Sequence, residues 1–409
     1  MTRATPLDDG APACAAREPS PRTTPAPRLP LAALLVMAAM GFILIAPEPM
    51  PAGLLPQISA GLDITEGTAG QLVSVYALGT IAATMPAVAL TRGMRRKPVF
   101  LVGILGFLAA NLVTAFSPDI ALSLGARFIA GAFSGLLWGM LAGYARRITA
   151  PEFAGRALAI ASVGTPVGLA VGTPLGSWLG TAFDWRWSFG TLGILTAATA
   201  LLAAVLVPDA AGQRAESRVP LARVLRIPGV AVILAVIVAW MLGHNILYTY
   251  ISAYLAASGV RLSPGVALAV FGVAALAGIG ITAAVIDHAL RRLVFTSIGL
   301  FAAAGLVFII GHRSVPAVLA AIVVWGIAFG GAAAQLQTAI GAASGENADV
   351  ANSMLGVAFN LAIFAAGVAG AVVIGTFDGV ALPVVMTGLA VLALVVAVTG
   401  RRAAFPATP

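Results

Sequence analysis

One feature of this chain constrains its fold more than any other: from Leu31 onward, apolar stretches of about 18–26 residues alternate with short polar segments. A helix needs about 20 mostly apolar residues to cross the hydrocarbon core of a bilayer. The stretches also lack the strict alternation that is typical of membrane β-barrels. The pattern therefore predicts an all-α polytopic membrane protein with twelve transmembrane helices near residues 31–54, 68–90, 98–116, 120–142, 156–180, 187–207, 229–254, 265–286, 293–310, 317–339, 351–375 and 380–399.

The scarcity of charge supports this prediction. Only 9% of the residues are charged and 60% are hydrophobic, whereas a soluble domain carries about 25% charged residues. So few charges cannot cover the surface of a 409-residue protein in water. A soluble enzyme, a nucleic-acid-binding protein and a disordered scaffold are therefore excluded, and we expect a protein that is not an enzyme.

The positions of the basic residues indicate the orientation. If the N-terminus lies inside, nineteen of the 23 Lys and Arg residues lie in inner segments and three lie in outer segments. Cytoplasmic loops of membrane proteins carry such an excess. Both termini are therefore predicted to be cytoplasmic, and the net charge of +8 reflects membrane topology instead of a nucleic-acid partner.

The chain also reads as two similar halves. Residues 87–96, at the end of the second predicted span, align with residues 283–292, at the end of the eighth, and both segments finish on an Arg-Arg pair. Two halves related by an axis along the membrane normal place a ligand site between them. We expect a disordered tail at 1–30, six-helix bundles at 31–207 and 229–400, a cytoplasmic linker at 208–228 and a second tail at 401–409.

Metal and nucleotide chemistry find no support in the sequence. Cys14 is the single cysteine, and His244, His288 and His312 are the only histidines. Disulfides within the chain and Cys-based metal sites are thus impossible, and scattered histidines do not make a zinc site. The phosphate-binding pattern GxxxxGK[ST] does not occur either. We expect no metal and no cofactor.

Two charged side chains fall inside the predicted spans. Glu48 lies in the outer part of the first span, where a carboxylate is costly to keep ionised and suits reversible protonation. Arg127 follows Asp119 by eight residues, or about 12 Å of helix. We interpret the pair as the proton-coupling site, in which the two charges pair or exchange partners. The alternatives are that the neighbouring prolines leave Glu48 in a solvated loop, or that the pair is a fixed structural ion pair.

The fifth predicted span carries a glycine every four residues, from Gly164 through Gly168, Gly172 and Gly176 to Gly180, with Pro166 and Pro174 among them. Such a stripe forms a groove of bare backbone that lets another helix approach closely. The prolines bend the helix. The pattern indicates either a packing groove alone or a hinge and seal between the two halves.

Polar and aromatic side chains inside the spans are candidates for a substrate cavity, because lipid does not satisfy their hydrogen bonds. Tyr250 and Tyr254 also fit an aromatic belt at the membrane surface. The residues that we assign to the cavity are Tyr76, Trp138, His244, Asn245, Tyr248, Gln335 and Asn360.

Several of these segments resemble the major facilitator superfamily, specifically the drug:proton antiporter-1 family, with its chloramphenicol-resistance and arabinose-efflux-like proteins. The similarity covers about residues 31–400 and rests on residues 51–58 after Glu48, 69–79, 127–131, 172–176, 184–189 and 243–250. The resemblance implies that Arg127 takes part in proton coupling. It also implies that Gly168, Gly172, Pro174 and Gly176 belong to the antiporter motif of the fifth helix.

The inner-loop motif of that superfamily is incomplete in this chain. Its glycine, aspartate and glycine are replaced by Ala87, Thr91 and Met94, whereas the second half keeps Asp287. We therefore expect a cytoplasmic gate whose acidic partner is missing from the first half. The gating residues that the resemblance implies are Arg92, Arg95, Arg96, Asp287, Arg291 and Arg292.

As a function, the resemblance implies a proton-coupled efflux antiporter of the bacterial inner membrane that exports a small amphipathic solute, such as a drug, an antibiotic or a sugar-like compound. Its partners would be protons, the solute and the lipid bilayer, with no nucleic acid, and the protein would be a monomer. The alternatives are a proton-coupled symporter for nutrient uptake and a membrane receptor that transports nothing.

Overall fold

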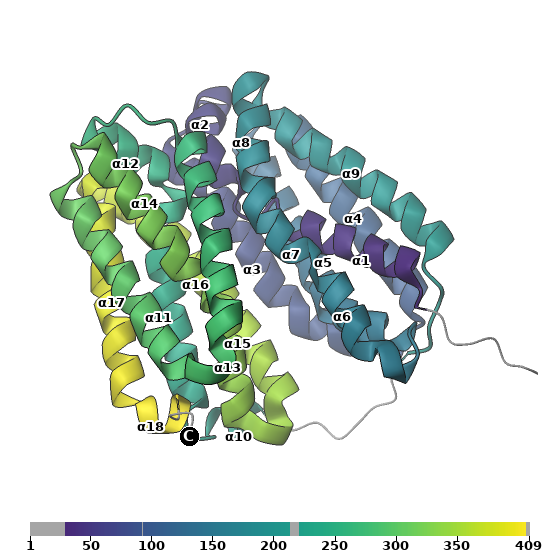
Figure 1. Cartoon of the computed structure of the whole chain (residues 1–409). Helices are drawn as coiled ribbons and strands as arrows, with labels where there is room; N and C mark the ends of the chain where they lie inside the picture. The colour runs from purple at the N-terminus through teal and green to yellow at the C-terminus, as the bar shows by residue number, and fades with distance from the viewer. Residues whose placement is uncertain (1–28, 92, 213–220, 406–409) are drawn as a thin grey trace, which may run out of the picture.

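The computed structural model describes residues 29–91, 93–212 and 221–405, and these residues form helices and turns without a β-strand. The expected disordered tail lies almost wholly outside the described residues, as do Arg92 and the middle of the linker. In Figure 1 the helices that precede the linker form one set and those that follow it form a second set beside the first.

The first set begins with a broken span, which consists of α1, a 3₁₀ turn at Met50–Leu54 and α2. It continues with three long helices and an interrupted series, in which the π-helical turn Gly168–Gly172 separates α7 from α8. The helices are α1 (Leu31–Ile45), α2 (Leu55–Leu62), α3 (Glu66–Thr91), α4 (Arg96–Phe116), α5 (Ile120–Arg147), α6 (Ala154–Ser162), α7 (Gly164–Val167), α8 (Thr173–Ala182) and α9 (Trp185–Leu206).

The second set follows the short linker helix α10 (Leu221–Leu225). Its longest element, α13, spans 47 residues but has a non-helical residue at Ala289, between two of the predicted spans. The helices are α11 (Val230–Thr249), α12 (Ile251–Ser258), α13 (Pro264–Ile310), α14 (Val315–Gly330), α15 (Ala332–Ser344), α16 (Ala348–Thr376), α17 (Leu382–Thr399) and α18 (Arg401–Ala404).

Eight helical segments among the described residues are long and apolar enough to cross a membrane, or nine if the bent first span is counted. One of them, α13, covers two of the twelve predicted spans. The other two predicted spans correspond to α3, which has 26 residues, and to the interrupted series α6–α8. The first span is not one straight helix as its apolar run suggested, because α1 and the segment Met50–Leu62 are bent by 52°.

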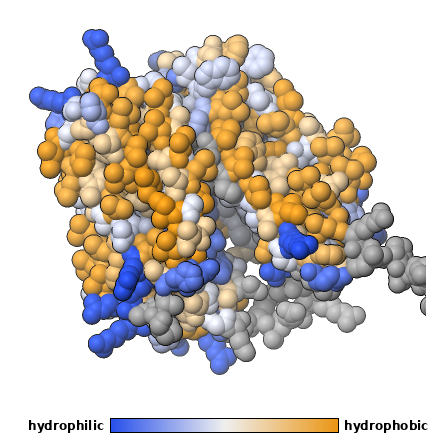
Figure 2. Space-filling view, in the orientation of Figure 1, coloured by the Kyte–Doolittle hydropathy of each residue, from blue (hydrophilic) through white to orange (hydrophobic). Residues whose placement is uncertain are grey.

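The surface agrees with a membrane protein. Figure 2 shows apolar residues across the middle of both sets, and hydrophilic residues gathered mainly at the lower end and at one upper corner. Many large apolar side chains are exposed there, among them Val205, Val273 and Ile310, which are 72%, 71% and 83% exposed. Side chains of this kind are stable on a surface that contacts lipid tails.

The two sets meet at the end where α2, α8 and α12 lie, which is the upper end of Figure 1, and are further apart at the lower end. There α3 packs against α16, and α8 packs against α13. The buried side chains Leu54, Leu72 and Phe189 of the first set belong to the same apolar core as the second set. The structure is therefore closed at its upper end.

The glycine stripe of the fifth predicted span packs against the first span along its whole length. A Cβ atom on Gly164 would lie 1.7 Å from the Ala38 carbonyl oxygen, and one on Gly168 would lie 2.2 Å from Ile45 Cγ2. Gly172, Gly176 and Gly180 face Ala46, Met50 and Leu54 in the same way. The glycines therefore bring two helices close together within one half, and the same helix series also contacts α13 of the other half.

This close approach makes a prediction about stability. Gly164→Ala should lower the free energy of unfolding by about 1–3 kcal/mol, because the added methyl group overlaps a backbone carbonyl that cannot move alone. Thermal unfolding in detergent measures the change.

Gly190→Ala is the matched control, because a Cβ atom there would have no neighbour within 4 Å and alanine is the better helix former. Equal melting temperatures for the two variants would contradict the packing described here.

Candidate functional site

The site begins at the break in the first span. Pro47 and Pro49 have no backbone N–H and cannot continue the hydrogen-bond pattern of a helix, so α1 ends at Ile45 and residues 46–49 form turns. Glu48 lies in this turn and is half-buried. Its carboxylate has no hydrogen-bond or ion-pair partner in the part of the chain that the structure describes. A carboxylate so placed is available to a proton.

Arg127 of α5 is fully buried and binds the backbone at the same break. Its Nη2 donates to the Pro47 carbonyl oxygen at 2.8 Å, and its Nε donates to the Leu72 carbonyl oxygen of α3 at 3.0 Å. The guanidinium carbon lies 4.3 Å from the centre of the Tyr76 ring, a cation–π contact. One side chain thus holds the first span, α3 and α5 together.

Glu48 and Arg127 come close to each other without forming an ion pair. The two charges act on each other electrostatically, but among the described residues no carboxylate oxygen lies within 4.0 Å of an Arg127 nitrogen. Arg127 Nη1 is buried without an acceptor. The fixed ion pair that the sequence left open is therefore absent from this conformation, and so is the fully solvated loop.

Tyr76 supports this arrangement from α3. Its hydroxyl group donates to the Leu44 carbonyl oxygen at 3.1 Å, and its ring is buried beneath the Arg127 guanidinium. The side chain that was predicted to line a cavity therefore lies against Arg127.

The second set contributes an aromatic cluster around His244. The His244 ring stacks on Phe329, with ring centres 3.6 Å apart and an interplanar angle of 3°. Its Nδ1 accepts a hydrogen bond from Trp325 Nε1 at 3.0 Å. Tyr248 and Phe271 lie within 5.1 and 5.5 Å of the same ring. Two of the predicted cavity residues, His244 and Tyr248, are thus brought together by α11, α13 and α14.

The remaining predicted cavity residues are dispersed. Gln335 is buried and donates to the hydroxyl oxygens of Thr282 and Ser297, both at 3.1 Å. Asn245 and Asn360 donate to carbonyl oxygens one turn back in their own helices. Trp138 lines a small cavity of about 70 Å³ between α5 and α6, within the first set.

Hydrogen bonds join the two sets at the upper end. Gln71 Nε2 donates to the Gly367 carbonyl oxygen at 3.1 Å, and the Ser252 hydroxyl group donates to Glu66 Oε2 at 2.9 Å. The Tyr250 hydroxyl group donates to the Gly67 carbonyl oxygen of the first set at 3.4 Å, and to the Gly367 carbonyl oxygen of its own set at 2.6 Å. The interpretation of Tyr250 and Tyr254 as a surface belt is wrong, because both rings are completely buried in the protein.

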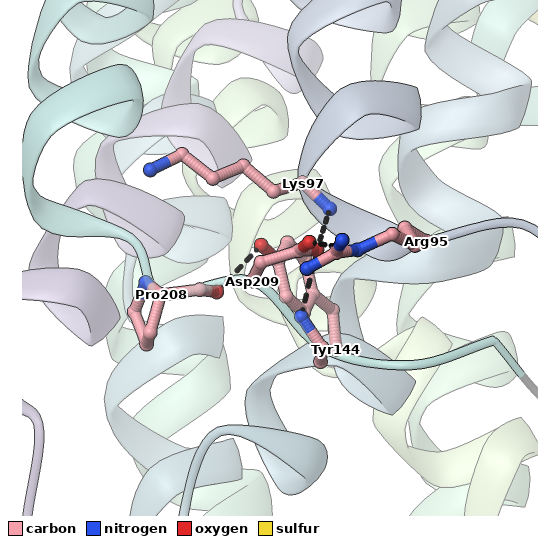
Figure 3. A network of polar contacts seen from close by, with 6 residues as sticks. Arg95, Lys97, Tyr144, Pro208 and Asp209 are labelled. Carbon is pink, nitrogen blue, oxygen red and sulfur yellow. Dashed lines mark hydrogen bonds and ion pairs between the residues drawn. The ribbon is translucent and has the colours of Figure 1, made fainter.

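At the lower end, the first part of the linker is bound to the first set (Figure 3). Arg95 Nε lies 2.5 Å from Asp209 Oδ2, and the Lys97 backbone N–H donates to Asp209 Oδ1 at 3.0 Å. The Tyr144 hydroxyl group donates to the Pro208 carbonyl oxygen at 2.9 Å. The acidic residue that the inner-loop motif lacks is thus replaced, as a partner for Arg95, by a linker residue.

The other gating candidates lie in different surroundings. Arg96 is buried, and its backbone N–H donates to the Ala210 carbonyl oxygen. Arg291 donates to the carbonyl oxygens of Arg401 and Phe405 near the C-terminus. Asp287 and Arg292 are exposed, and neither forms an ion pair among the described residues. Arg92 lies outside the described residues.

Sequence reasoning missed Asp209, Phe271, Trp325 and Phe329. Asp209 looked like one of many charges in a loop, and the three aromatic residues lie in apolar spans where such side chains are common. Only their position around His244 and Arg95 distinguishes them. The spacing of Trp325 and Phe329, four residues apart on one helix face, was a weak signal.

A family model described as Major Facilitator Superfamily matches residues 31–366. A chloramphenicol efflux pump of Mycobacterium tuberculosis is 31% identical over 350 residues, which cover 82% of this chain and 84% of that protein. A probable sugar efflux transporter of Mannheimia succiniciproducens is 25% identical over 339 residues, which cover 81% of this chain and 84% of that protein.

Among solved structures, the POT family transporter PepTSo has a similar fold. The TM-score is 0.72 at 10% sequence identity, and the match covers 92% of this chain and 98% of that one. At this identity the similarity concerns the fold alone.

The network in Figure 3 makes a prediction about Asp209→Asn. The hydrogen bond from the Lys97 backbone N–H, together with Arg95, holds the pKa of Asp209 below its ordinary value of 3.8. A carboxyl group with a lowered pKa stabilises the folded state above its unfolded pKa, and this contribution is lost as the pH falls through the folded pKa. Amide hydrogen exchange at Lys97 should therefore be several-fold faster in the variant at pH 7.

The difference between variant and wild type should disappear only in strong acid. Asp287→Asn, which removes an exposed carboxylate of the second set, should leave exchange at Lys97 unchanged. An Asp209→Asn protein with wild-type exchange at neutral pH would contradict the anchoring role of this residue.

Proposed function

Because the chain belongs to the Major Facilitator Superfamily, and its fold and relatives are those of transporters and not of enzymes, we propose that it is a proton-coupled efflux antiporter. It exports a small amphipathic solute by alternating access. In this proposal twelve spans form two bundles of six, at 31–207 and 229–400, in the bacterial inner membrane, with both termini and the linker 208–228 in the cytoplasm. It acts as a monomer with protons, the solute and lipid as its partners.

The observation that carries the proposal is the arrangement of Glu48 and Arg127. A half-buried carboxylate without a partner lies at a helix break, and a buried guanidinium with one free nitrogen holds the backbone of that break. Intramembrane charges of this kind are costly and are typical of proton pathways.

Protonation of Glu48 would change the forces on the break. The ionised carboxylate attracts the free Nη1 of Arg127, whereas the neutral acid does not, and Arg127 then holds only the carbonyl oxygens of Pro47 and Leu72. Protonation of Glu48 would therefore change the forces on the first span and on α3 together. Since α3 packs against α16 of the other bundle, the same contact links the coupling pair to the closed upper end.

Alternating access then needs two opposite-facing states that the proton and the solute favour differently. The state described here is closed at the upper end, which is the outer end in this topology. Opening requires that α3 and α16 separate and that the hydrogen bonds of Gln71 and Ser252 across the halves break. The predicted gating residues of the lower end would form their contacts in that second state.

The relatives support the direction of transport. The pump of Mycobacterium tuberculosis is named for chloramphenicol efflux and the protein of Mannheimia succiniciproducens for sugar efflux. We therefore take export as the direction, and a drug or a sugar-like compound as the class of solute. A proton-coupled symporter for uptake remains the second candidate, because the same coupling pair serves either direction.

Glu48→Gln should abolish export driven by a pH gradient, because the amide cannot bind and release the proton. The measurement is the transport of chloramphenicol into everted membrane vesicles. A pH jump imposes the proton gradient, so no ATP is needed. Glu152→Gln, a change in an exposed carboxylate in the turn between α5 and α6, is the control. Wild-type accumulation in the Glu48→Gln vesicles would remove Glu48 from the mechanism.

Antiport and symport differ in the sign of a pH change. When the solute is added to de-energised cells in a weakly buffered medium, antiport should acidify the medium, because protons leave as the solute enters. Alkalinisation would establish the symporter instead, and no pH change with solute entry would exclude proton coupling in both forms.

A further inference from the structure

The charges inside the membrane-spanning helices are divided unequally between the two halves. The first half holds Glu48 and Arg127, whereas residues 230–258, 264–286, 293–310, 315–344, 350–376 and 382–399 of the second half contain no Asp, Glu, Lys or Arg. A solute that binds to these segments therefore meets no formal charge from them. Its recognition rests on rings and on neutral hydrogen-bonding groups.

The rings are concentrated around His244. Phe329 covers one face of the imidazole in parallel stacking, and Tyr248, Phe271 and Trp325 surround the rest at 5.1, 5.5 and 5.3 Å between ring centres. We call these five side chains the aromatic cluster. Offset and tilted ring contacts at such distances are favourable, and the same surface accepts the ring of a ligand.

Trp325 determines which nitrogen of His244 carries the proton. An indole N–H can only donate a hydrogen bond, and it lies 3.0 Å from Nδ1 of His244. Nδ1 must therefore be the unprotonated acceptor, the imidazole is neutral, and its single N–H is on Nε2. His244 therefore has one hydrogen-bond donor, its Nε2–H, and no formal charge.

The cluster lies close to the boundary between the halves. Leu268, one turn from Phe271 on α13, would be 3.2 Å from a Cβ atom on Gly53 of the first half. His244, Tyr248 and Phe271 keep 6%, 6% and 8% of their surface exposed, whereas Trp325 behind them keeps 1%. Phe329 is only partly buried, so the cluster is most exposed at Phe329, next to the small exposed areas of His244, Tyr248 and Phe271, whereas the indole is enclosed.

We propose that the aromatic cluster is the solute-binding subsite of the second half and selects an uncharged solute with an aromatic ring and a hydrogen-bond acceptor. The solute ring packs against Tyr248 and Phe271, and its acceptor oxygen takes the hydrogen bond from His244 Nε2. Trp325 is a positioning residue that keeps His244 in the donating tautomer. The proposal rests on the proposed function for the transport step but not for binding.

The same chemistry disfavours the other two classes of solute. A cation finds no carboxylate in the membrane-spanning segments of this half, and the Nε2–H of His244 points a positive edge toward it. A sugar needs several donors and acceptors, because each hydroxyl group that is buried unpaired costs free energy, and the cluster consists mainly of aromatic rings. Relatives are named for chloramphenicol and for sugar, and of these two solutes the cluster favours chloramphenicol.

Equilibrium binding to the purified full-length protein tests the proposal with three radiolabelled probes: chloramphenicol, which is aromatic and uncharged; tetraphenylphosphonium, which is aromatic and cationic; and L-arabinose, which is neither. Chloramphenicol should bind at least about tenfold more tightly than the other two, as expected for one good hydrogen bond and the ring contacts together. Equal or weaker binding of chloramphenicol would overturn the proposal.

His244→Phe keeps a ring that stacks on Phe329 and removes the donor, and should weaken chloramphenicol binding about tenfold. His312→Phe is the matched control, since His312 lies in a turn after α13 and contacts the Ile309 carbonyl oxygen. If both variants bind chloramphenicol equally well, His244 does not contact the solute.

The role of Trp325 has a spectroscopic test, because the chain has only three histidines. In protein labelled with ¹⁵N-histidine, the signals that disappear in His244→Phe should have the pattern of an Nε2–H tautomer. Trp325→Phe should change this pattern, and chloramphenicol should shift the Nε2 signal in the wild type. A signal that does not respond to chloramphenicol would rule out the contact.

Failure of the subsite and failure of the proposed function give different results. Selective, His244-dependent binding without proton-driven transport would leave the subsite standing and contradict the antiporter. If His244→Phe leaves proton-driven transport of chloramphenicol unchanged, the antiporter is supported and the subsite is contradicted.

Discussion

The contact between Arg127 and the Pro47 carbonyl oxygen is the interaction on which the site depends. A carbonyl group that leaves a helix inside a membrane protein must find another donor, because lipid offers none. The proline-rich turn after Ile45 frees such a group, and the buried guanidinium satisfies it. The buried charge of Arg127 is in turn stabilised, because its guanidinium group also donates to the Leu72 carbonyl oxygen and lies over the Tyr76 ring. The break in the first span therefore needs a hydrogen-bond donor, which Arg127 supplies, and the buried Arg127 needs an acceptor, which the break supplies.

The glycine stripe completes this arrangement from the other side. Because Gly168 and Gly172 have no side chains, the backbone of the first span approaches closely at Ile45 and Ala46, immediately before the break. The π-helical turn lies at the same level, and such turns are frequent at functional sites. The break is thus fixed between a cation on one helix and bare backbone on another, while the Glu48 carboxylate has no hydrogen-bond or ion-pair partner among the described residues.

In the proposal, the proton acts on the charged residues of the first half, and the solute binds to the aromatic rings of the second half. In the proposed mechanism the first half keeps Glu48 and Arg127 beside α3, the helix that contacts α16, so a change in protonation would act where the halves meet. The second half holds neutral polar groups, such as His244 and Gln335, each of which has a hydrogen bond with a side chain of its own half. A proton and a neutral solute can then act on separate parts of the same closed contact.

Much of the site was predictable, because some residues are improbable in lipid wherever they lie. Glu48 and Arg127 stood out as charges in apolar runs, and the glycine stripe stood out by its period of four. The partners of these residues were not predictable. Arg127 binds two carbonyl oxygens and not the carboxylate that its charge suggested, and carbonyl groups have no signature in a sequence. Asp209 likewise gained its meaning only from Arg95 and Lys97.

The sequence by itself determined that this protein is a polytopic helical membrane protein, because the length and polarity of its segments are set by the bilayer and not by their neighbours. It also determined which residues are costly to bury. The tertiary structure decided how those costs are met, which halves of broken helices belong together, and that Phe271, Trp325 and Phe329 surround one histidine. Contacts between residues far apart in the chain depend on how helices cross, and no local pattern contains that information.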